Sequence, residues 1–380
     1  MIRRPPRSTQ SRSSAASDVY KRQTYDNSAN ATRCGYVKGD LTLASGINST
    51  GTCLTVNASN IVIDCAGNWV NYTGSGYAID ITGQSNVTVK NCRIRNQGSP
   101  TVDSIYLYRS RNCILRNITM SDLSGTRFTG VYNWMSNNTQ ILDSYIYGST
   151  STEVALTVNA SSGVTIENND LGGTLALLIE ESSGTSVLRN RFTIGAGAIR
   201  RIHLNSSHSN ALDGNNMTIS GVGADAVLLS ASDSNTLQNN RISTNGSGAY
   251  GFKLIGSDGN TITSNRISSL TADNPAILLD ASDSNTIEDN LLNTSQYMSY
   301  GVELKSQASG NTLRNNNISS IGIMDRTDSS VTNTMSYSTS FGSITWSTGS
   351  FAQNLTCNGT ELSLARFIFA ANLALSLIHI

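Results

Sequence analysis

The stretch SDSNTLQNNRIS, Ser232–Ser243, decides the fold because near-copies of it recur along the chain. The next copies read SDGNTITSNRIS at Ser257–Ser268 and SDSNTIEDNLLN at Ser282–Asn293. Self-similarity at a fixed period of about 20–50 residues is the signature of a solenoid or another repeat architecture. The period of these copies and the pattern inside each copy therefore predict the architecture.

An aliphatic residue inside this phrase forms a column of eleven positions, spaced 25 or 26 residues apart except for one spacing of 21. The positions are Ile63, Val89, Leu115, Ile141, Ile166, Val187, Leu212, Leu237, Ile262, Ile287 and Leu313. A second apolar column follows five residues later, and a third precedes the first by eight or nine residues. Apolar and polar residues alternate within each unit, which is the period of a β-strand. Such short strands bury their inward residues only by stacking, so the sequence predicts an all-β fold, a parallel β-helix of about eleven coils of 25–26 residues.

These phrases and the opening GTCLTVNASNIVIDCAGNWV, Gly51–Val70, resemble right-handed parallel β-helix repeats. The resemblance is to the pectate-lyase-like superfamily, and within it to exported proteins of the periplasmic copper-associated β-helix type. It spans about Cys34 to Gly322. The resemblance implies a right-handed β-helix from an exported or cell-surface protein, with a periplasmic location as the alternative. It indicates little about activity, because one fold hosts many functions.

The two ends differ from the repeats. Met1–Gln23 is rich in Arg and Ser and resembles translated sequencing adapter, as does Leu375–Ile380. The expected organisation is an N-terminal cap over 24–56, the β-helix over 57–322, and a C-terminal cap or truncated β module over 323–374. The chain is thus expected to be a fragment.

Charge and hydropathy exclude some partners. The first 23 residues hold six of the 26 basic residues and one of the 26 acidic ones, which leaves 20 basic and 25 acidic. This balance argues against a nucleic-acid partner. No run of 18 apolar residues occurs, so the sequence predicts no membrane span. Fifteen N-x-S/T sequons suit a glycosylated surface protein.

Five of the six cysteines lie in the first third of the chain, and none forms a CxxC pair of the kind that binds zinc. They suit one or two disulfides near the N-terminal end, or equally buried small hydrophobic residues.

An asparagine column runs through seven consecutive coils, three residues after the first apolar column. Its members are Asn169, Asn190, Asn215, Asn240, Asn265, Asn290 and Asn316. Asparagine tolerates the left-handed backbone of tight turns, and stacked carboxamides can bond to one another along the rod. The column predicts a structural ladder and no catalytic role.

Asp233, Asp258 and Asp283 form another column, at the position that His208 occupies one coil earlier. Stacked carboxylates could bind Ca²⁺, which takes several oxygen ligands, but capping of each residue's own turn is the simpler interpretation. The sequence therefore predicts no cofactor, with Ca²⁺ as the open alternative. The two histidines outside the adapter-like ends, His203 and His208, have no grouped Met or Cys that would indicate copper.

Aromatic residues gather on three consecutive coils, with arginines nearby. The candidate ligand-binding residues are Tyr106, Tyr108, Arg109, Tyr132, Trp134, Tyr145 and Tyr147. Alternation places Tyr106 and Tyr108 outward around Leu107, and Tyr145 and Tyr147 outward around Ile146. Exposed aromatic rings beside guanidinium groups suit contact with sugar rings or with a protein.

No catalytic residue stands out, because the positions expected to be exposed contain no adjacent acids. The expected function is structural, adhesive or glycan-binding, with a polysaccharide or a cell-surface protein as partner. The alternative is a polysaccharide lyase or glycoside hydrolase.

Overall fold

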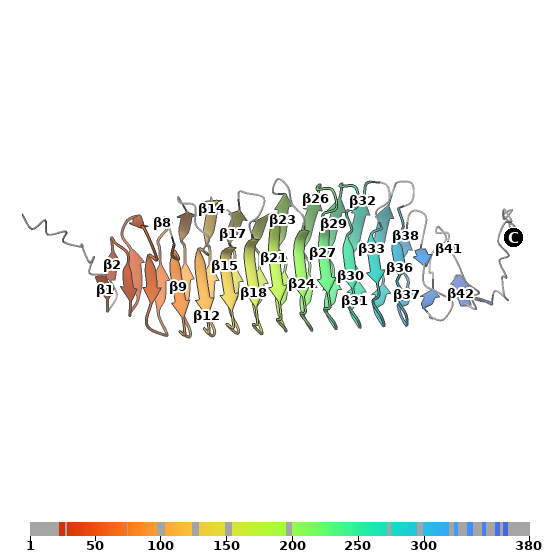
Figure 1. Ribbon diagram of the computed structural model, residues 1–380, viewed down its shortest axis with the longest axis horizontal. Coiled ribbons are helices and arrows are strands. Elements are labelled where there is room, and N and C mark those ends of the chain that lie inside the picture. The colour runs from red at the N-terminus through yellow and green to blue at the C-terminus, as the bar shows by residue number, and fades with distance from the viewer. Residues whose placement is uncertain are drawn as a thin grey trace, which may run out of the picture.

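The computed structural model describes residues 23–318 except 27–28, 74, 97–102, 124–128, 149–153, 195–199, 272–274 and 295–298. Beyond residue 318 it describes 323–325, 333–336, 344–346, 354–357 and 360–363. The described residues form a rod in which each coil adds one strand to each of three parallel sheets (Figure 1). The prediction of an all-β parallel β-helix is confirmed.

Sheet A has fifteen strands among the described residues. They are β1 (Gln23–Tyr25), β3 (Gly35–Val37), β6 (Leu54–Val56), β9 (Ile79–Thr82), β12 (Ile105–Tyr108), β15 (Thr129–Trp134), β18 (Val154–Asn159), β21 (Leu175–Glu180), β24 (Arg200–Asn205), β27 (Asp225–Ser230), β30 (Phe252–Ile255), β33 (Ile277–Asp280), β36 (Val302–Lys305), β39 (Ile323–Asp325) and β41 (Ile344–Trp346).

Sheet B has fourteen strands in the same described part. They are β2 (Ala29–Ala31), β4 (Leu41–Leu43), β7 (Val62–Asp64), β10 (Thr88–Lys90), β13 (Ile114–Arg116), β16 (Gln140–Leu142), β19 (Thr165–Glu167), β22 (Ser186–Leu188), β25 (Ala211–Asp213), β28 (Thr236–Gln238), β31 (Thr261–Thr263), β34 (Thr286–Glu288), β37 (Thr312–Arg314) and β40 (Thr334–Ser336).

Sheet C has twelve strands within the described ranges. They are β5 (Ile47–Ser49), β8 (Trp69–Tyr72), β11 (Arg93–Asn96), β14 (Thr119–Leu123), β17 (Tyr145–Gly148), β20 (Asp170–Gly173), β23 (Arg191–Ile194), β26 (Asn216–Ile219), β29 (Arg241–Thr244), β32 (Arg266–Ser269), β35 (Leu291–Thr294) and β38 (Asn317–Ile318). An antiparallel hairpin of β42 (Asn354–Cys357) and β43 (Thr360–Ser363) follows the rod in sequence.

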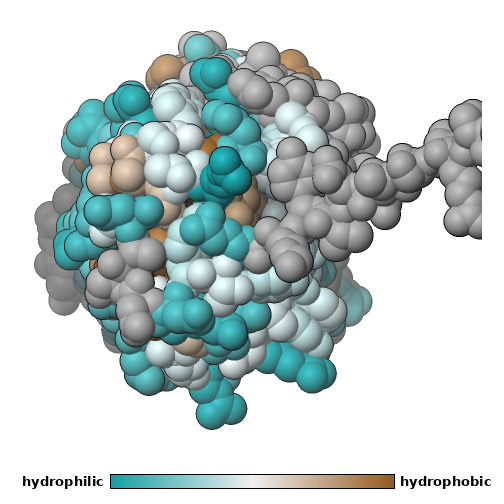
Figure 2. All heavy atoms as spheres, turned by 90° about the vertical axis from the view of Figure 1, so that its left-hand side faces the viewer, coloured by the Kyte–Doolittle hydropathy of each residue, from teal (hydrophilic) through white to brown (hydrophobic). Residues whose placement is uncertain are grey.

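The core is built from the predicted columns. Leu237 in β28 pairs with Leu212 on one side and Ile262 on the other, so the first apolar column stacks in register. Its eleven members are at most 1% exposed. Because every coil repeats the same inward positions, one continuous apolar core runs along the rod. Seen from its N-terminal end, the described surface is mainly hydrophilic, with a few hydrophobic residues between (Figure 2).

The sheets extend past the domain boundaries expected from the sequence. Strands β1 to β6, in the segment expected to be an N-terminal cap, already belong to the three sheets. Strands β39 and β41 add to sheet A, and β40 adds to sheet B, beyond residue 322. The adapter-like ends lie outside the described residues, apart from Gln23, which begins β1.

Candidate functional site

The outward face of sheet A carries two columns of side chains that run along the rod. Strand pairing aligns Asp80 with Tyr106, Tyr132 and Thr157 in the first column. The same pairing aligns Thr82 with Tyr108, Trp134 and Asn159 in the second. The buried residues between them, such as Leu107, point into the core. Successive coils thus bring aromatic residues together although they are about 26 residues apart in sequence.

Five rings on this face form one cluster, which we call the aromatic platform: Tyr77, Tyr106, Tyr108, Tyr132 and Trp134. The ring centroids of Tyr77 and Tyr106 lie 4.6 Å apart, and those of Tyr108 and Trp134 lie 4.7 Å apart. Tyr106 also lies 5.9 Å from Tyr132, which joins the rings into a continuous surface. All five residues are half-buried, so each ring packs against its neighbours and still faces solvent.

Arg109 lies at the edge of the platform. It follows β12 with a positive φ of 52°, which turns the chain away from the sheet. Its guanidinium carbon lies 4.9 Å from the centroid of the Tyr108 ring, a cation–π contact. Arg109 is exposed, so one cation borders the rings on this side.

Carboxylates border the other parts of the platform. Burial raises the pKa of Asp103 to about 6, although hydrogen bonds from Thr129 oppose the shift. Burial also raises the pKa of Tyr106, with further contributions from Tyr77, Tyr132 and Asp103. The Tyr106 hydroxyl therefore stays protonated and can donate a hydrogen bond at neutral pH.

The aromatic face continues into a polar segment on the next coils. Asn159 and Asn205 donate hydrogen bonds to the two oxygens of Glu180, at 2.8 and 3.0 Å. His203 Nε2 lies 3.3 Å from Ser230 Oγ. Burial, with Arg200 nearby, lowers the pKa of His203 to about 4, so the imidazole is neutral at pH 7. Glu180 lies two coils beyond Trp134, and His203 lies three coils beyond Tyr132, in the two outward columns that carry the rings.

Four outward positions of the first column are buried, although the sequence predicts them to be exposed. They are Thr157, Leu228, Leu278 and Glu303, all at most 8% exposed. Strand alternation alone does not determine which side chains on this outward face are exposed. The open aromatic part of sheet A is therefore confined to the N-terminal half of the rod.

The structure separates the seven candidate aromatic and arginine residues into two groups. Tyr106, Tyr108, Arg109, Tyr132 and Trp134 lie together at sheet A, whereas Tyr145 and Tyr147 lie on β17 of sheet C. Tyr145 and Tyr147 stack on each other with centroids 4.2 Å apart. The Tyr147 hydroxyl donates to Asp170 at 2.6 Å, and its ring covers Gly172, where an added Cβ would lie 2.5 Å from a ring carbon. Tyr147 is thus part of the packing of sheet C.

The seven asparagines of the predicted ladder are buried and bonded from coil to coil. Asn240 Oδ1 accepts both the backbone N–H and the side-chain amide of Asn215, each at 3.0 Å. The Asn240 amide donates in turn to Asn265 Oδ1 at 3.0 Å. The left-handed backbone lies one residue earlier, at Asn239 (φ 55°), so the ladder asparagine itself points inward from the turn.

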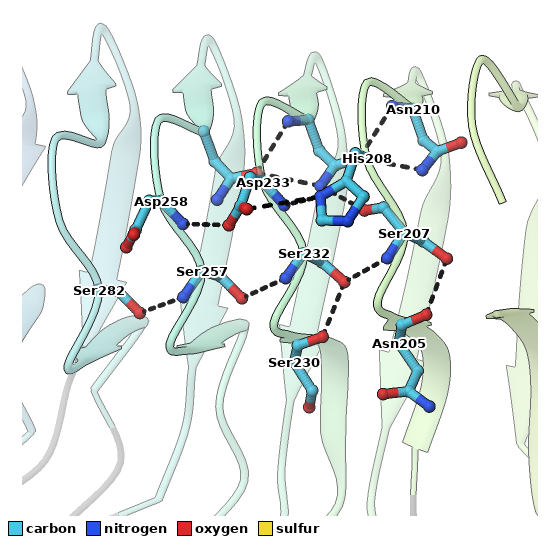
Figure 3. Close-up of polar contacts among 12 residues, drawn as sticks. Asn205, Ser207, His208, Asn210, Ser230, Ser232, Asp233, Ser257, Asp258 and Ser282 are labelled. Carbon is cyan, nitrogen blue, oxygen red and sulfur yellow. Dashed lines mark hydrogen bonds and ion pairs between the residues drawn. The ribbon is translucent and has the colours of Figure 1, made fainter. Parts of the chain in front are cut away.

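The sequence analysis did not identify two further columns of polar residues. A second buried asparagine column immediately precedes the sheet B strands β25, β28, β31, β34, β37 and β40, and in it Asn210 donates to Asn235 Oδ1 at 3.1 Å. Its members are Asn210, Asn235, Asn260, Asn285, Asn311 and Asn333. A serine column runs beside it, in which Ser232 N donates to Ser257 Oγ at 3.0 Å (Figure 3). Both columns have the period of the repeat, which is the signal that could have revealed them.

Each aspartate of the column caps the turn of the next coil rather than its own turn. Asp233 Oδ1 accepts the backbone N–H of Asp258 at 2.8 Å, and Asp258 Oδ1 accepts that of Asp283 at 2.7 Å. His208 Nδ1 likewise accepts the backbone N–H of Asp233 at 3.0 Å (Figure 3). Each carboxylate therefore stabilises the next coil. Among the residues that the structure describes, no three His, Cys, Asp or Glu side chains come together in a way that could hold a metal ion.

Both alternatives for the cysteines occur. Cys34 is bonded to Cys53 and Cys65 to Cys92, whereas Cys113 is a buried free thiol. The two disulfides join neighbouring coils at the N-terminal end of the rod. The side chain of Cys357 lies outside the described part. Within the residues that the structure covers, we find no helix of sufficient length and apolar character to cross a membrane.

Two family models match the chain. That of the periplasmic copper-binding protein (NosD) matches residues 173–353, and that of the right handed beta helix region matches residues 77–216. No curated protein shows a sequence match to the chain. The described residues offer no grouped ligands for the copper that the first description names, because His203 and His208 lie on different segments of their coil.

Solved structures of low sequence identity share the fold. A PL6 alginate lyase in complex with a trisaccharide has a TM-score of 0.50 at 12% identity, over 90% of this chain and 86% of that one. The A-module of Azotobacter vinelandii mannuronan C-5 epimerase AlgE6 has a TM-score of 0.46 at 15% identity, over 82% and 90% of the two chains. PfbA, a surface adhesin of Streptococcus pneumoniae, has a TM-score of 0.46 at 13% identity, over 72% and 84%.

Proposed function

We propose that this right-handed parallel β-helix repeat protein binds glycans on the aromatic platform of sheet A. The observation that supports the proposal is the continuous contact of five half-buried rings across consecutive coils. Rigid aromatic rings offer apolar area at a low cost in conformational entropy, and their faces suit the apolar faces of sugar rings.

Polar groups around the rings supply the second element that a saccharide site needs. Sugar hydroxyls donate and accept hydrogen bonds, so a site that binds them combines apolar surface with a few fixed polar groups. The tyrosine hydroxyls, Glu180 and Asn159 provide donors and acceptors beside the rings. The alginate lyase of similar fold is in complex with a trisaccharide, and this supports a saccharide as the class of ligand.

The proposal includes an exported location. The family model that matches residues 173–353 describes a periplasmic protein. The two disulfides agree with an oxidising compartment, since disulfides are rare in the cytosol. A rigid rod of this kind would act as an adhesive or structural element outside the cytoplasm.

Cleavage of the glycan is the alternative function. Hydrolysis by a pair of carboxylates places two acids about 5–10 Å apart on either side of the scissile bond. Asp103 and Glu180 both act on Tyr132, but both oxygens of Glu180 accept hydrogen bonds from the amides of Asn159 and Asn205. This arrangement supports binding in preference to acid–base chemistry.

The test uses two ring deletions. Trp134→Ala and Tyr106→Ala should each lower the affinity for a bound polysaccharide at least tenfold, because each removes a ring from the centre of the platform. Tyr145→Ala is the matched control, since Tyr145 is an exposed stacked tyrosine on sheet C. Affinity electrophoresis against a panel of neutral and acidic polysaccharides measures the change.

The outcomes separate the alternatives. Loss of binding in both platform variants with retention in Tyr145→Ala supports the proposal. Absence of binding to every polysaccharide tested contradicts it. Release of new reducing or unsaturated ends by the unmodified protein would establish the lyase or hydrolase instead.

A further inference from the structure

The charges that border the aromatic platform are mainly negative. Asp80, Asp103 and Glu180 lie around the rings, whereas Arg109 is the cation stacked at their edge. The sign of the charge on these bordering side chains determines which glycans can bind, because a bound ligand brings its own charges close to them. Each group is fixed by contacts that the structure shows.

Asp80 stands in the first outward column, one coil before Tyr106, and pairs with it across the strands. Thr82 Oγ1 donates to Asp80 Oδ1 at 2.7 Å, which holds the carboxylate on the outward face. Asp80 is half-buried and contributes to the raised pKa of the Tyr77 hydroxyl. A ligand stacked on Tyr77 and Tyr106 would therefore lie beside this carboxylate.

Asp103 lies two residues before β12, between Tyr77 and Thr129 of the neighbouring coils. The Thr129 hydroxyl and backbone N–H both bond to it. Its charge acts on Tyr77, Tyr106 and Tyr132, which are three of the five rings. Asp103 is thus the carboxylate nearest the centre of the platform.

Glu180 closes the C-terminal side of the platform. Asn159 and Asn205 donate to its two oxygens, which orients the carboxylate. It contributes, with Asp103, to the raised pKa of Tyr132. The charged groups that act on Tyr77 and Tyr132 are all carboxylates among the described residues. The next cations along sheet A are Arg200 and Arg201 on β24, whereas Lys253 on β30 pairs with Asp225 at 3.7 Å.

We infer that the platform selects uncharged glycans and rejects polymers of uronic acids. The inference rests on the proposed glycan binding and names its ligand class. A uronate carboxylate bound over Tyr106 would meet Asp80 and Asp103, and one bound over Tyr132 would meet Asp103 and Glu180. Arg109 is the cation at the edge of the rings. A neutral sugar would use the same carboxylates as hydrogen-bond acceptors for its hydroxyl groups.

The experiment compares neutral β-glucans and mannans with alginate and polygalacturonate at low ionic strength, where charge effects are strongest. The unmodified protein should bind at least one neutral polymer and bind the uronates at least tenfold more weakly. In Asp80→Asn/Asp103→Asn the uronate affinity should rise about tenfold, because each unit charge at about 6 Å in water changes affinity about threefold. Affinity for the neutral polymer should not rise, because the substitutions remove two carboxylate acceptors of its hydroxyl groups. The ratio of uronate to neutral affinity should therefore increase by at least tenfold.

Asp289→Asn is the control for net charge, since Asp289 is exposed in a turn after sheet B and Asn tolerates its φ of 55°. It should leave the selectivity unchanged. Thermal unfolding checks that each variant is folded. Uronate binding as strong as neutral binding in the unmodified protein overturns this inference and leaves the glycan site intact. Absence of binding to any polymer overturns the proposed function itself.

Discussion

Asp103 shows at the residue scale how position within a coil changes the chemistry of a side chain. Its carboxyl group accepts hydrogen bonds from Thr129, and burial raises its pKa to about 6 from the usual 3.8. The ionised form is therefore less stable in the folded protein than in the unfolded chain. The contribution of Asp103 to stability is complete below about pH 4 and is lost as the pH rises through about 6.

A substitution tests the direction of this pH dependence of stability. Asp103→Asn removes the charge and keeps an acceptor for Thr129, so it should raise the free energy of unfolding at pH 7.5 by up to about 3 kcal/mol. At pH 4 the same substitution should have little effect, because Asp103 is already protonated there. Thermal unfolding at the two pH values measures the difference. Equal shifts of the melting temperature at both would show that the raised pKa is not the cause.

At the scale of single elements, the turns on both sides of a sheet B strand determine how coils stack. Each sheet B strand from β25 to β37 lies between two buried asparagines, as β28 lies between Asn235 and Asn240, which both bond to the next coil. The preceding residues, Ser234 and Asn239, adopt the left-handed backbone that forms each turn. Local turn geometry and contacts between coils are therefore specified together in the same five or six residues.

Asn240→Leu tests the ladder. The substitution leaves the backbone N–H and the amide of Asn215 without their acceptor, and the carbonyl of Leu212 without its donor. A buried unpaired polar group costs about 1–3 kcal/mol, so the free energy of unfolding should fall by at least 2 kcal/mol. Denaturant unfolding measures it. The exposed Asn245, replaced by Leu as the control, should change stability by less than about 0.5 kcal/mol. Similar losses in both variants would contradict a role specific to the ladder.

Periodicity predicted the inward positions well because each coil repeats them, and it predicted the outward positions less well. Leu228 and Leu278 alternate correctly yet are buried, so strand alternation alone does not determine exposure on the outward face of sheet A. Tyr145 could have been placed correctly, because Ile146 belongs to the second apolar column whereas Leu107 belongs to the third. Asn235 belongs to a column as regular as that of Asn240, so the same periodicity could have predicted it.

At the scale of the whole molecule, the rod is a linear stack whose coils contact mainly their neighbours. The two disulfides close loops of 19 and 27 residues in sequence separation, both at the N-terminal end. Cross-links of this length stabilise by about 3 kcal/mol each. The N-terminal coils should therefore depend on oxidation more than the C-terminal coils do.

Reduction tests this dependence. After treatment with a reducing agent, hydrogen exchange should accelerate in β3 to β11 and change little in β28 to β35, because neighbouring coils transmit the loss only partly. Cys34→Ser/Cys53→Ser should reproduce the effect at the first coils without a reductant. Uniform acceleration along the rod would indicate that all coils unfold as one unit.

The central claim is that the aromatic platform binds a glycan, and a crystal structure of the protein with a neutral oligosaccharide tests it most directly. Sugar rings are expected over Tyr106, Tyr132 and Trp134, with hydroxyl groups bonded to Asp80, Asp103 or Glu180. An oligosaccharide bound elsewhere on the rod, with the platform bare, would contradict the claim.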